Sequence, residues 1–398
     1  MDSKPTDSEP PVELPPPAEP EAPPKEIDET SLVPVLISGW IFIILLSLGP
    51  FSKQSPFKYQ YVSNFIGSNA KPSKTRPLLT NSSYHADVLL IYVYANVHRH
   101  AYENLKYFIE NAVREQDGVD YIFILQQTEN KSIDESKMPP LPKTNAFYFQ
   151  HENKCFDFGT MGWFFSKYTI GNPWQKQSSV TNSNMNNNKT NRIFDIRRYK
   201  YFIFMNSSTR GPFFPPYFLQ FLSDYENEFN APYYWYYIFT KRINDKVKLA
   251  GPTVACTPVM HVQSYLITTD FTGLTVLLKS ATDNDGKVHR GVFGCYPSQV
   301  ETITFSELSI TTEILSAGYM ITGLMAKYQL MNFSKNDHRK CTVYGSPYTD
   351  KWIDGTSLEP YDVVFVKYNN KTMTIEAQGR AKIYEQWMKA IKTKDKIS

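Results

Sequence analysis

Two polar segments of the sequence carry side chains suited to binding a small anionic ligand. In Glu152–Thr160, a carboxylate at Asp157 stands close to a glycine and offers an acceptor for a ribose or a base edge. In Asn206–Phe213, hydroxyls and amides precede Arg210 and a Gly-Pro pair, which would give a diphosphate hydrogen-bond donors and one fixed cation. Both segments also have a plainer interpretation, because Asp157 could lie in the N-cap region of a helix and Asn206–Phe213 could be a polar turn.

A third polar segment, His261–Tyr265, precedes an apolar run that ends at Asp270. His261 and Gln263 could take part in acceptor recognition or in catalysis. A lone histidine is just as readily a structural residue with its hydrogen bonds satisfied by the protein, and both interpretations stay open.

The pattern of apolar residues from Tyr84 onward predicts the elements that position these segments. It predicts strands over residues 88–94, 121–125, 146–149 and 199–205, and helices over residues 102–113 and 160–168. Uninterrupted apolar strands that alternate with amphipathic helices are typical of an α/β fold, a mostly parallel sheet covered on both faces. Ligands of such sheets bind beyond the carboxyl ends of the strands, which is where the polar segments would lie.

The N-terminal part of the chain has a different composition. Residues 1–31 are rich in Pro and Glu and are predicted to be a disordered tail. Residues 32–51 belong to a charge-free stretch long enough for one transmembrane helix, although a buried helix of a soluble protein stays an alternative. Residues 52–83 are interpreted as a stem and residues 84–392 as the globular domain, with a low-complexity loop over 178–190.

Two sequence features disagree about the side of the membrane on which the domain lies. Lys25 precedes the predicted span, whereas Lys53 and Lys58 follow it, and the positive-inside rule alone would place the domain in the cytosol. Six N-glycosylation sequons follow the span, which favours the lumen. Their asparagines are Asn81, Asn130, Asn188, Asn206, Asn332 and Asn370.

The charge distribution bears on the kind of ligand. The net charge is +3, but residues 1–31 hold nine acidic residues and two lysines, so they carry −7 and the rest carries +10. No block of Lys or Arg stands out in that remainder. This balance favours a phosphate-bearing small substrate over a nucleic acid.

The chain has four cysteines, Cys155, Cys256, Cys295 and Cys341, and no CxxC pair. This spacing does not predict a zinc site. One or two disulfides would form in a lumenal domain, with three pairings open, and four buried thiols are the alternative.

Residues 86–375 resemble GT-A-type glycosyltransferases, specifically the rhamnan-synthesis F-like group. The likeness is carried by five ordered blocks that together span most of the domain. The blocks are ENKCFDFGTMGW (Glu152–Trp163), YKYFIFMNSSTRGPFFPPY (Tyr199–Tyr217), VKLAGPTVACTPVMHVQSYLITTD (Val247–Asp270), SELSITTEILSAGYMI (Ser306–Ile321) and EPYDVVFVKYNN (Glu359–Asn370).

The resemblance implies a nucleotide-sugar site. Asp157 would bind the nucleotide, and Asn206 and Ser208 stand where many GT-A enzymes carry an Asp-x-Asp metal motif. The carboxylates of that motif are missing here, and divalent cations prefer anionic oxygens. We therefore assign no metal ligands and expect either weak metal use or a metal-independent reaction, in which Arg210 or lysines neutralise the diphosphate. The sequon at Asn206 would then be buried and unglycosylated.

The resemblance also implies a catalytic carboxylate. Glu307 stands eleven residues before Gly318, at the start of a predicted amphipathic helix, and matches the acidic position of the group. In an inverting transfer this carboxylate would deprotonate the acceptor hydroxyl. Glu307 could instead be a helix cap, and Glu301 and Glu313 are weaker candidates. His261 and Gln263 would line the acceptor side.

The sequence thus predicts a glycosyltransferase that moves a sugar from a nucleotide-sugar donor to a glycan or glycoprotein acceptor. The resemblance favours a single-pass type II protein of the Golgi or endoplasmic reticulum membrane with a lumenal catalytic domain. A membrane-tethered glycan-binding protein without catalysis, favoured by the missing metal motif, is the alternative, and a passive tether is a third interpretation. The donor sugar and the stereochemistry do not follow from the sequence.

Overall fold

The computed structural model describes ten stretches of the chain. They are residues 84–127, 131–174, 192–215, 217–218, 221, 234–279, 281–282, 288–341, 359–368 and 375–394. All of them belong to the second of two compact units, which begins at Asn81. The predicted tail (1–31), transmembrane helix (32–51), stem (52–83) and loop (178–190) lie outside the described residues. Within those residues no helix combines the length and the apolar character needed to cross a membrane.

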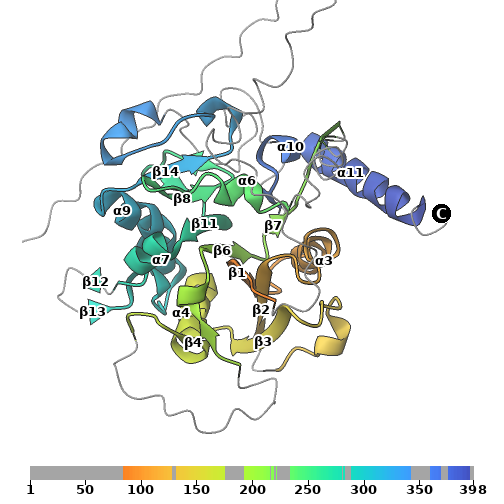
Figure 1. Ribbon diagram of the computed structural model, residues 1–398, viewed down its shortest axis with the longest axis horizontal. Coiled ribbons are helices and arrows are strands. Elements are labelled where there is room, and N and C mark those ends of the chain that lie inside the picture. Colours follow the sequence, from red (N-terminus) through yellow and green to blue (C-terminus); the bar gives the residue numbers. More distant parts are fainter. Residues whose placement is uncertain are drawn as a thin grey trace, which may run out of the picture. The chain divides into compact units, whose positions relative to one another are not determined.

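A seven-stranded sheet in the order β14-β8-β11-β6-β1-β2-β3 forms the centre of the fold (Figure 1). All neighbouring strands are parallel except β11, which runs antiparallel to both β6 and β8. The prediction of a mostly parallel α/β sheet is therefore confirmed. The strands are β1 (Val88–Tyr94), β2 (Val119–Gln127), β3 (Ala146–Glu152), β6 (Tyr201–Asn206), β8 (Val247–Gly251), β11 (Leu266–Asp270) and β14 (Met320–Gly323).

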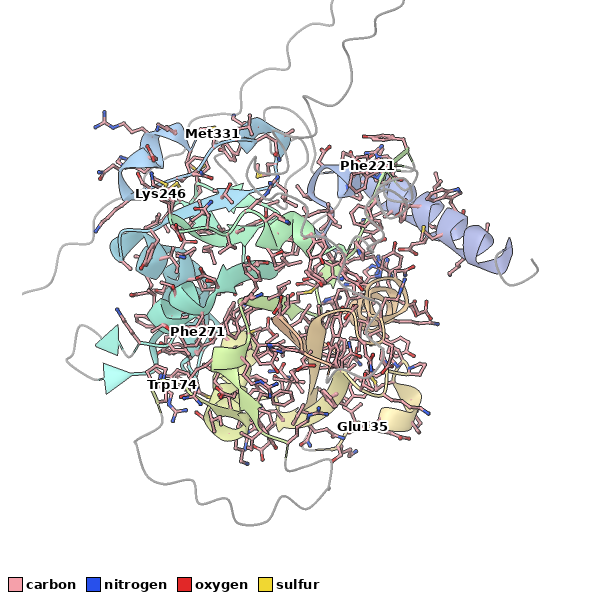
Figure 2. The ribbon with its side chains drawn as sticks, in the orientation of Figure 1. Glu135, Trp174, Phe221, Lys246, Phe271 and Met331 are labelled. Atoms are coloured by element: carbon pink, nitrogen blue, oxygen red, sulfur yellow. A yellow bond between two sulfur atoms is a disulfide. The ribbon has the colours of Figure 1, made fainter. Side chains whose placement is uncertain are left out.

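Helices cover both faces of this sheet, with α4, α7 and α9 on one face and α3 and α6 on the other (Figure 1). Every residue of β1 is buried because its side chains alternate between the two helical layers. Tyr92 of β1 stacks on Phe108 of α3, while Phe204 of β6 meets Phe165 of α4 on the opposite face. Figure 2 shows the side chains gathered on both sides of the sheet. The helices are α3 (Ala101–Ala112), α4 (Phe156–Tyr168), α6 (Tyr237–Thr240), α7 (Phe271–Leu277) and α9 (Ser309–Ser316).

Smaller elements complete the described fold. A continuous helical segment runs from α8 (Gln299–Thr302) through a π-helical turn (Ile303–Leu308) into α9. Helices α10 (Pro360–Val363) and α11 (Ile375–Lys394) follow near the C-terminus. Four two-stranded pairs join β4 (Thr169–Ile170) to β5 (Phe194–Asp195), β7 (Thr209–Arg210) to β15 (Val366–Lys367), β9 (Val254–Ala255) to β10 (His261–Val262) and β12 (Ala281–Thr282) to β13 (Val288–His289).

Several predicted boundaries differ from the structure. Strand β1 matches its prediction, and β2 and β3 continue further toward their carboxyl ends. Strand β6 begins at Tyr201, two residues after the predicted start, and includes Asn206. Helix α4 begins at Phe156 and not near Thr160, so Asp157 lies in its first turn.

Candidate functional site

Three polar side chains join the end of β6 to the start of α4. The Asn206 side-chain amide donates a hydrogen bond to Asp157 Oδ2 over 3.0 Å. Asn206 Oδ1 accepts hydrogen bonds from the Ser208 backbone N–H at 3.1 Å and from the Ser208 hydroxyl at 2.6 Å. The sequence-predicted residues Asp157, Asn206 and Ser208 therefore lie together at the carboxyl edge of the sheet.

The Asp157 carboxyl has a perturbed acidity. Burial raises its pKa to about 6, and the negative charge of Glu307 adds to that effect. The hydrogen bond from Asn206 and the positive charge of Lys367 act in the opposite direction. Asp157, Glu307 and Lys367 thus lie within electrostatic reach of one another, although they are far apart in the sequence.

Glu307 faces this edge from the helical segment on the other side. Its Oε2 accepts a hydrogen bond of 2.6 Å from the Ser264 hydroxyl, in the turn between β10 and β11. Glu307 lies inside the π-helical turn and not at a helix start, so the expectation of its position is corrected. The cap is formed upstream, where the Ser298 hydroxyl accepts from the Glu301 backbone N–H and donates to Glu301 Oε2. Glu301 is therefore a capping residue.

The two predicted acceptor-side residues differ in their surroundings. His261, on β10, is partly exposed and its Nδ1 lies 2.7 Å from the Val259 carbonyl oxygen. Burial lowers the His261 pKa, and the charge of Glu307 opposes this, which places the ring near Glu307. Gln263 is buried, and its Oε1 accepts a 2.7 Å hydrogen bond from the Thr253 hydroxyl. His261 thus borders the site, whereas the Gln263 side chain is held by the protein.

Arg210 has protein partners in this structure. The residue is 6% exposed, and its guanidinium forms an ion pair of 3.1 Å with Glu385 of α11. It also lies 4.4 Å from the centre of the Tyr368 ring. The guanidinium is therefore turned toward α11, and its binding to a diphosphate stays a prediction.

Lys367 was not singled out from the sequence, although it belongs to the fifth block of the resemblance. Strand β15 pairs with β7 so that Lys367 lies opposite Thr209, directly after the Asn206–Ser208 turn. The positive charge of Lys367 lowers the pKa of both Asp157 and His261. Because β15 has only two residues, its periodicity gave no sign that it would reach the sheet edge.

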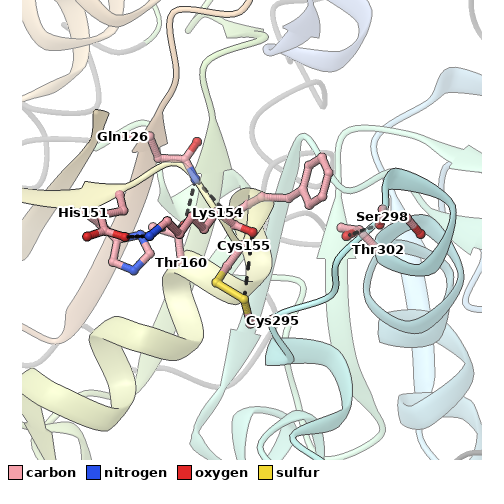
Figure 3. The surroundings of a disulfide bond; sticks show 10 residues. Gln126, His151, Lys154, Cys155, Thr160, Cys295, Ser298 and Thr302 are labelled. Carbon is pink, nitrogen blue, oxygen red and sulfur yellow. Dashed lines mark hydrogen bonds and ion pairs between the residues drawn. A yellow bond between two sulfur atoms is a disulfide. The ribbon is translucent and has the colours of Figure 1, made fainter. Parts of the chain in front are cut away.

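A disulfide fastens the two sides of the site to each other. Cys155, the residue before α4, is bonded to Cys295, three residues before Ser298 at the cap of α8 (Figure 3). Helix α4 packs tightly here, because a Cβ on Gly162 would lie 2.1 Å from the Phe293 carbonyl oxygen. The second disulfide joins Cys256 to Cys341, so all four cysteines are paired and the pairing left open by the sequence is resolved.

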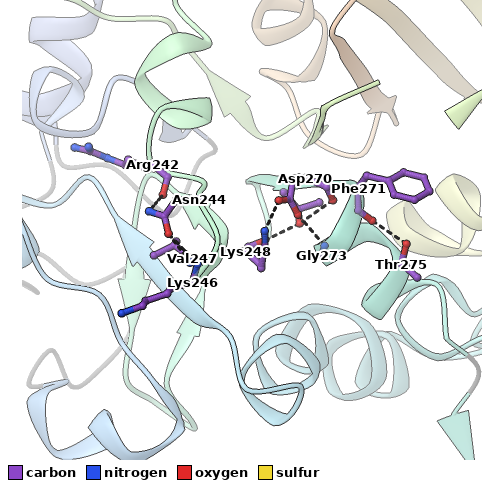
Figure 4. Close-up of polar contacts among 10 residues, drawn as sticks. Arg242, Asn244, Lys246, Val247, Lys248, Asp270, Phe271, Gly273 and Thr275 are labelled. Carbon is purple, nitrogen blue, oxygen red and sulfur yellow. Dashed lines mark hydrogen bonds and ion pairs between the residues drawn. The ribbon is translucent and has the colours of Figure 1, made fainter. Parts of the chain in front are cut away.

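Asp270, which follows the third polar segment, lies at the opposite edge of the sheet because β11 is antiparallel. Its carboxylate accepts from Lys248 Nζ at 2.6 Å and caps α7 through the Gly273 backbone N–H at 2.9 Å (Figure 4). Lys248 is 6% exposed. This is a structural ion pair and helix cap, away from the candidate site.

The Asn206–Ser208 turn lacks the carboxylates that a divalent cation prefers. Asn206 and Ser208 offer amide and hydroxyl oxygens, and Asn206 Oδ1 is already engaged by Ser208. Neutral oxygens are weaker ligands than carboxylates for Mg²⁺ or Mn²⁺. No group of three or more His, Cys, Asp or Glu among the described residues could hold a metal ion. We assign no role to a divalent cation at this turn.

Comparison with known proteins adds no family assignment. No protein-family model matches the chain, and no curated protein is significantly similar to it.

Proposed function

We propose that this protein is a GT-A-type glycosyltransferase that moves a sugar from a nucleotide-sugar donor to a hydroxyl of a glycan or glycoprotein acceptor. One observation carries the proposal. Each of the five blocks of the resemblance contributes at least one polar residue to the same edge of a mostly parallel sheet. Those residues are Asp157, Asn206 with Ser208, Ser264, Glu307 and Lys367.

The geometry supports a direct displacement with Glu307 as the general base. Ser264 holds Oε2 of Glu307, and we assign Oε1 to the acceptor hydroxyl. The hydroxyl oxygen attacks the anomeric carbon, the bond from that carbon to the phosphate oxygen of the donor breaks, and Glu307 takes the hydroxyl proton. The nucleoside diphosphate leaves with the bonding electron pair, and the configuration at the anomeric carbon is inverted.

The donor would lie against the residues of β6 and α4. The Asn206 amide donates one N–H to Asp157 and keeps its second N–H for a ligand, and the contacts with Asp157 and Ser208 hold this amide in place before any ligand arrives. Asp157 would accept a hydrogen bond from the nucleotide. Its raised pKa is consistent with a functional position, since perturbed carboxylates gather at such sites.

The cellular location is also part of the proposal. Two disulfides are favoured by an oxidising compartment such as the lumen of the secretory pathway. They support the type II orientation over the one that the positive-inside rule predicts, with a span at residues 32–51. Asn332 is exposed and lies in a sequon, whereas Asn206 is hydrogen-bonded within the site. In cells, a glycosidase-sensitive mobility shift that is reduced by Asn332→Gln would support a lumenal domain, and a lack of any shift would argue against it.

The catalytic proposal is tested by a donor screen. The full chain is incubated with a panel of nucleotide sugars, with and without EDTA, and mass spectrometry follows sugar release and transfer. We expect turnover of at least one donor that persists in EDTA and is lost in Glu307→Gln. Glu313→Gln is the matched control, since Glu313 lies on α9 of the same helical segment.

A second candidate function is glycan binding without catalysis. The observation that favours it is the Asn206-Ser207-Ser208 turn, which lacks the carboxylates of an Asp-x-Asp motif. This candidate predicts no turnover of any donor by a folded protein that still binds glycans on an array. Turnover that depends on Glu307 would exclude it.

A further inference from the structure

Two segments without a role in the proposed mechanism meet the Asn206–Ser208 turn. The Tyr368 backbone N–H, next to Lys367, donates to the Ser208 carbonyl oxygen over 2.6 Å. Asn104 of α3 is fully buried, and its amide donates to the carbonyls of Ser207 at 2.9 Å and Tyr368 at 3.0 Å. The carboxyl end of β6, the start of α3 and strand β15 are therefore fixed together.

The loop between β1 and α3 brings basic side chains to the same place. His100 contacts the Tyr368 ring edge-on, with ring centres 5.0 Å apart, and Arg99 Nε donates to His100 Nε2 over 3.1 Å. The backbone N–H of His100 donates to Nδ1 of His98, which holds the His98 ring beside this group. We call His98, Arg99, His100 and Lys367 the basic rim.

Burial and the neighbouring basic groups lower the pKa of both histidines of the basic rim. Burial lowers the pKa of His98, and the neighbouring His100 and Lys367 lower it further, while the Ser207 carbonyl partly opposes them. Burial, Arg99 and Arg210 lower the pKa of His100. Like charges held close together cost stability, and a bound anion would offset that cost. Lys367 in turn lowers the pKa of Asp157 on the facing helix α4.

We propose that Lys367, supported by the rest of the basic rim, is the cation that neutralises the diphosphate of the donor in place of a divalent metal. This inference rests on the proposed function and names the leaving-group subsite of the same site. Lys367 is partly exposed and lies opposite Thr209, directly after the Asn206–Ser208 turn, and its charge acts on Asp157 at the same edge. A lysine serves a diphosphate well, since it acts as a point charge without strict geometry.

The probe for this inference is inorganic pyrophosphate, which has the charge of the leaving group without a base or a sugar. Its binding to the full chain is measured by calorimetry in EDTA over a series of salt concentrations. In Lys367→Met we expect affinity to fall by about ten- to a hundredfold, the usual effect of losing a hydrogen bond to a charged group. Lys367→Arg should keep most of the affinity. Lys335→Met removes the same charge from an exposed helix and should stay within about twofold of wild type.

The imidazoles are tested in the same way. His98→Gln should weaken pyrophosphate binding, whereas His338→Gln, at an exposed position of the helical turn Lys335–Lys340, should not. Retained melting temperature in each variant shows that a loss of affinity is not a loss of fold. If Lys367→Met unfolds the chain, the test uses Lys367→Gln instead, together with His98→Gln and its control His338→Gln.

Two results would overturn the inference. One is a wild-type chain that does not bind pyrophosphate in EDTA, and the other is unchanged affinity in a folded Lys367→Met variant. Failure of the transferase proposal gives a different outcome, in which pyrophosphate binding depends on Lys367 but no donor is turned over. If a sugar is transferred but the affinity for pyrophosphate does not depend on Lys367, the proposed function stands and the basic rim has no part in it.

Discussion

The side-chain amide of Asn206, at the end of β6, donates a 3.0 Å hydrogen bond to the carboxylate of Asp157 in the first turn of α4. This contact joins two segments that are 49 residues apart in the sequence. The same carboxylate feels the negative charge of Glu307 from a third segment. Asp157 is thus the point at which the donor half and the acceptor half of the proposed site meet.

The raised pKa of Asp157 predicts a pH dependence of stability. Its pKa is about 6 in the folded protein, above the ordinary value of an aspartate, so the folded state binds the proton more tightly than the unfolded state. The stabilisation is complete below about pH 4 and is lost as pH rises through about 6. Relative to wild type, Asp157→Asn should therefore gain about 2 kcal/mol between pH 4 and pH 7. Urea unfolding at the two pH values measures this.

Asp245 provides the control for that measurement, because it is an exposed aspartate in the turn before β8. Asp245→Asn should change stability in parallel with wild type over the same pH range. Parallel curves for Asp157→Asn and wild type would mean that burial does not perturb this carboxyl.

Ser264 is predicted to position the base. Removing its hydroxyl frees the Glu307 carboxylate to rotate, since the 2.6 Å hydrogen bond is lost. Ser264→Ala should lower kcat by roughly ten- to a hundredfold and leave KM for the donor within about twofold. Ser264→Thr should restore most of kcat. Ser309→Ala, on the same helical segment with its hydroxyl bonded to the Thr304 carbonyl, is the control. A fall in donor affinity without a change in kcat would contradict the assignment.

The two disulfides should differ in their effect on ligand binding. Replacing either pair by serine should cost about 4–5 kcal/mol, because each closes a long loop, of 140 residues for Cys155–Cys295 and 85 for Cys256–Cys341. Of the two disulfides, only Cys155–Cys295 connects the start of α4, where Asp157 lies, to the segment that leads to Glu307. Under conditions in which both double variants are folded, donor affinity should fall only when that bond is missing. Equal affinities by calorimetry would show that the bond stabilises the fold without shaping the site.

Gly162 is predicted to be essential for the seating of α4. An added methyl group would collide with the Phe293 backbone at 2.1 Å, so Gly162→Ala should destabilise by about 1–3 kcal/mol. Gly379 lies exposed inside α11 with nothing within 4 Å of an added Cβ, and Gly379→Ala should stabilise by roughly 0.5–1 kcal/mol. Opposite signs in chemical denaturation are the expected result. A neutral Gly162→Ala would show that α4 can move away from Phe293.

Strands β1, β2, β3 and β6 were predictable because each contains an uninterrupted apolar run, whereas no range was predicted for β8, β11 or β14. A strand that is buried on both faces of the sheet must be apolar at every position, and β1 follows that rule from Val88 to Tyr94. The order of the strands and the reversal of β11 were not predictable, because neither leaves a periodic signal in one sequence. That reversal explains why Asp270 lies far from the residues that precede β11.

The site was predictable where polar residues directly follow a strand, as at Asn206. It was less so where position depends on contacts between distant segments. The sequence predicts that Arg210 is available to a diphosphate, but in the structure it pairs with Glu385, which lies 175 residues later in the chain. Lys367 was overlooked because the two-residue strand β15 has no pattern of its own. The basic residues of the His98–His100 loop are visible in the sequence, but only the fold places them near Tyr368 and Lys367.

The central claim is that Glu307 removes a proton from the acceptor hydroxyl. Once the donor screen has identified a substrate, the decisive measurement is single-turnover sugar transfer by Glu307→Gln and Glu313→Gln at equal donor occupancy. A general base contributes about 10²- to 10⁴-fold, so Glu307→Gln should lose at least a hundredfold in transfer rate while Glu313→Gln matches wild type. Equal rates in the two variants, with both proteins folded and loaded with donor, would contradict it.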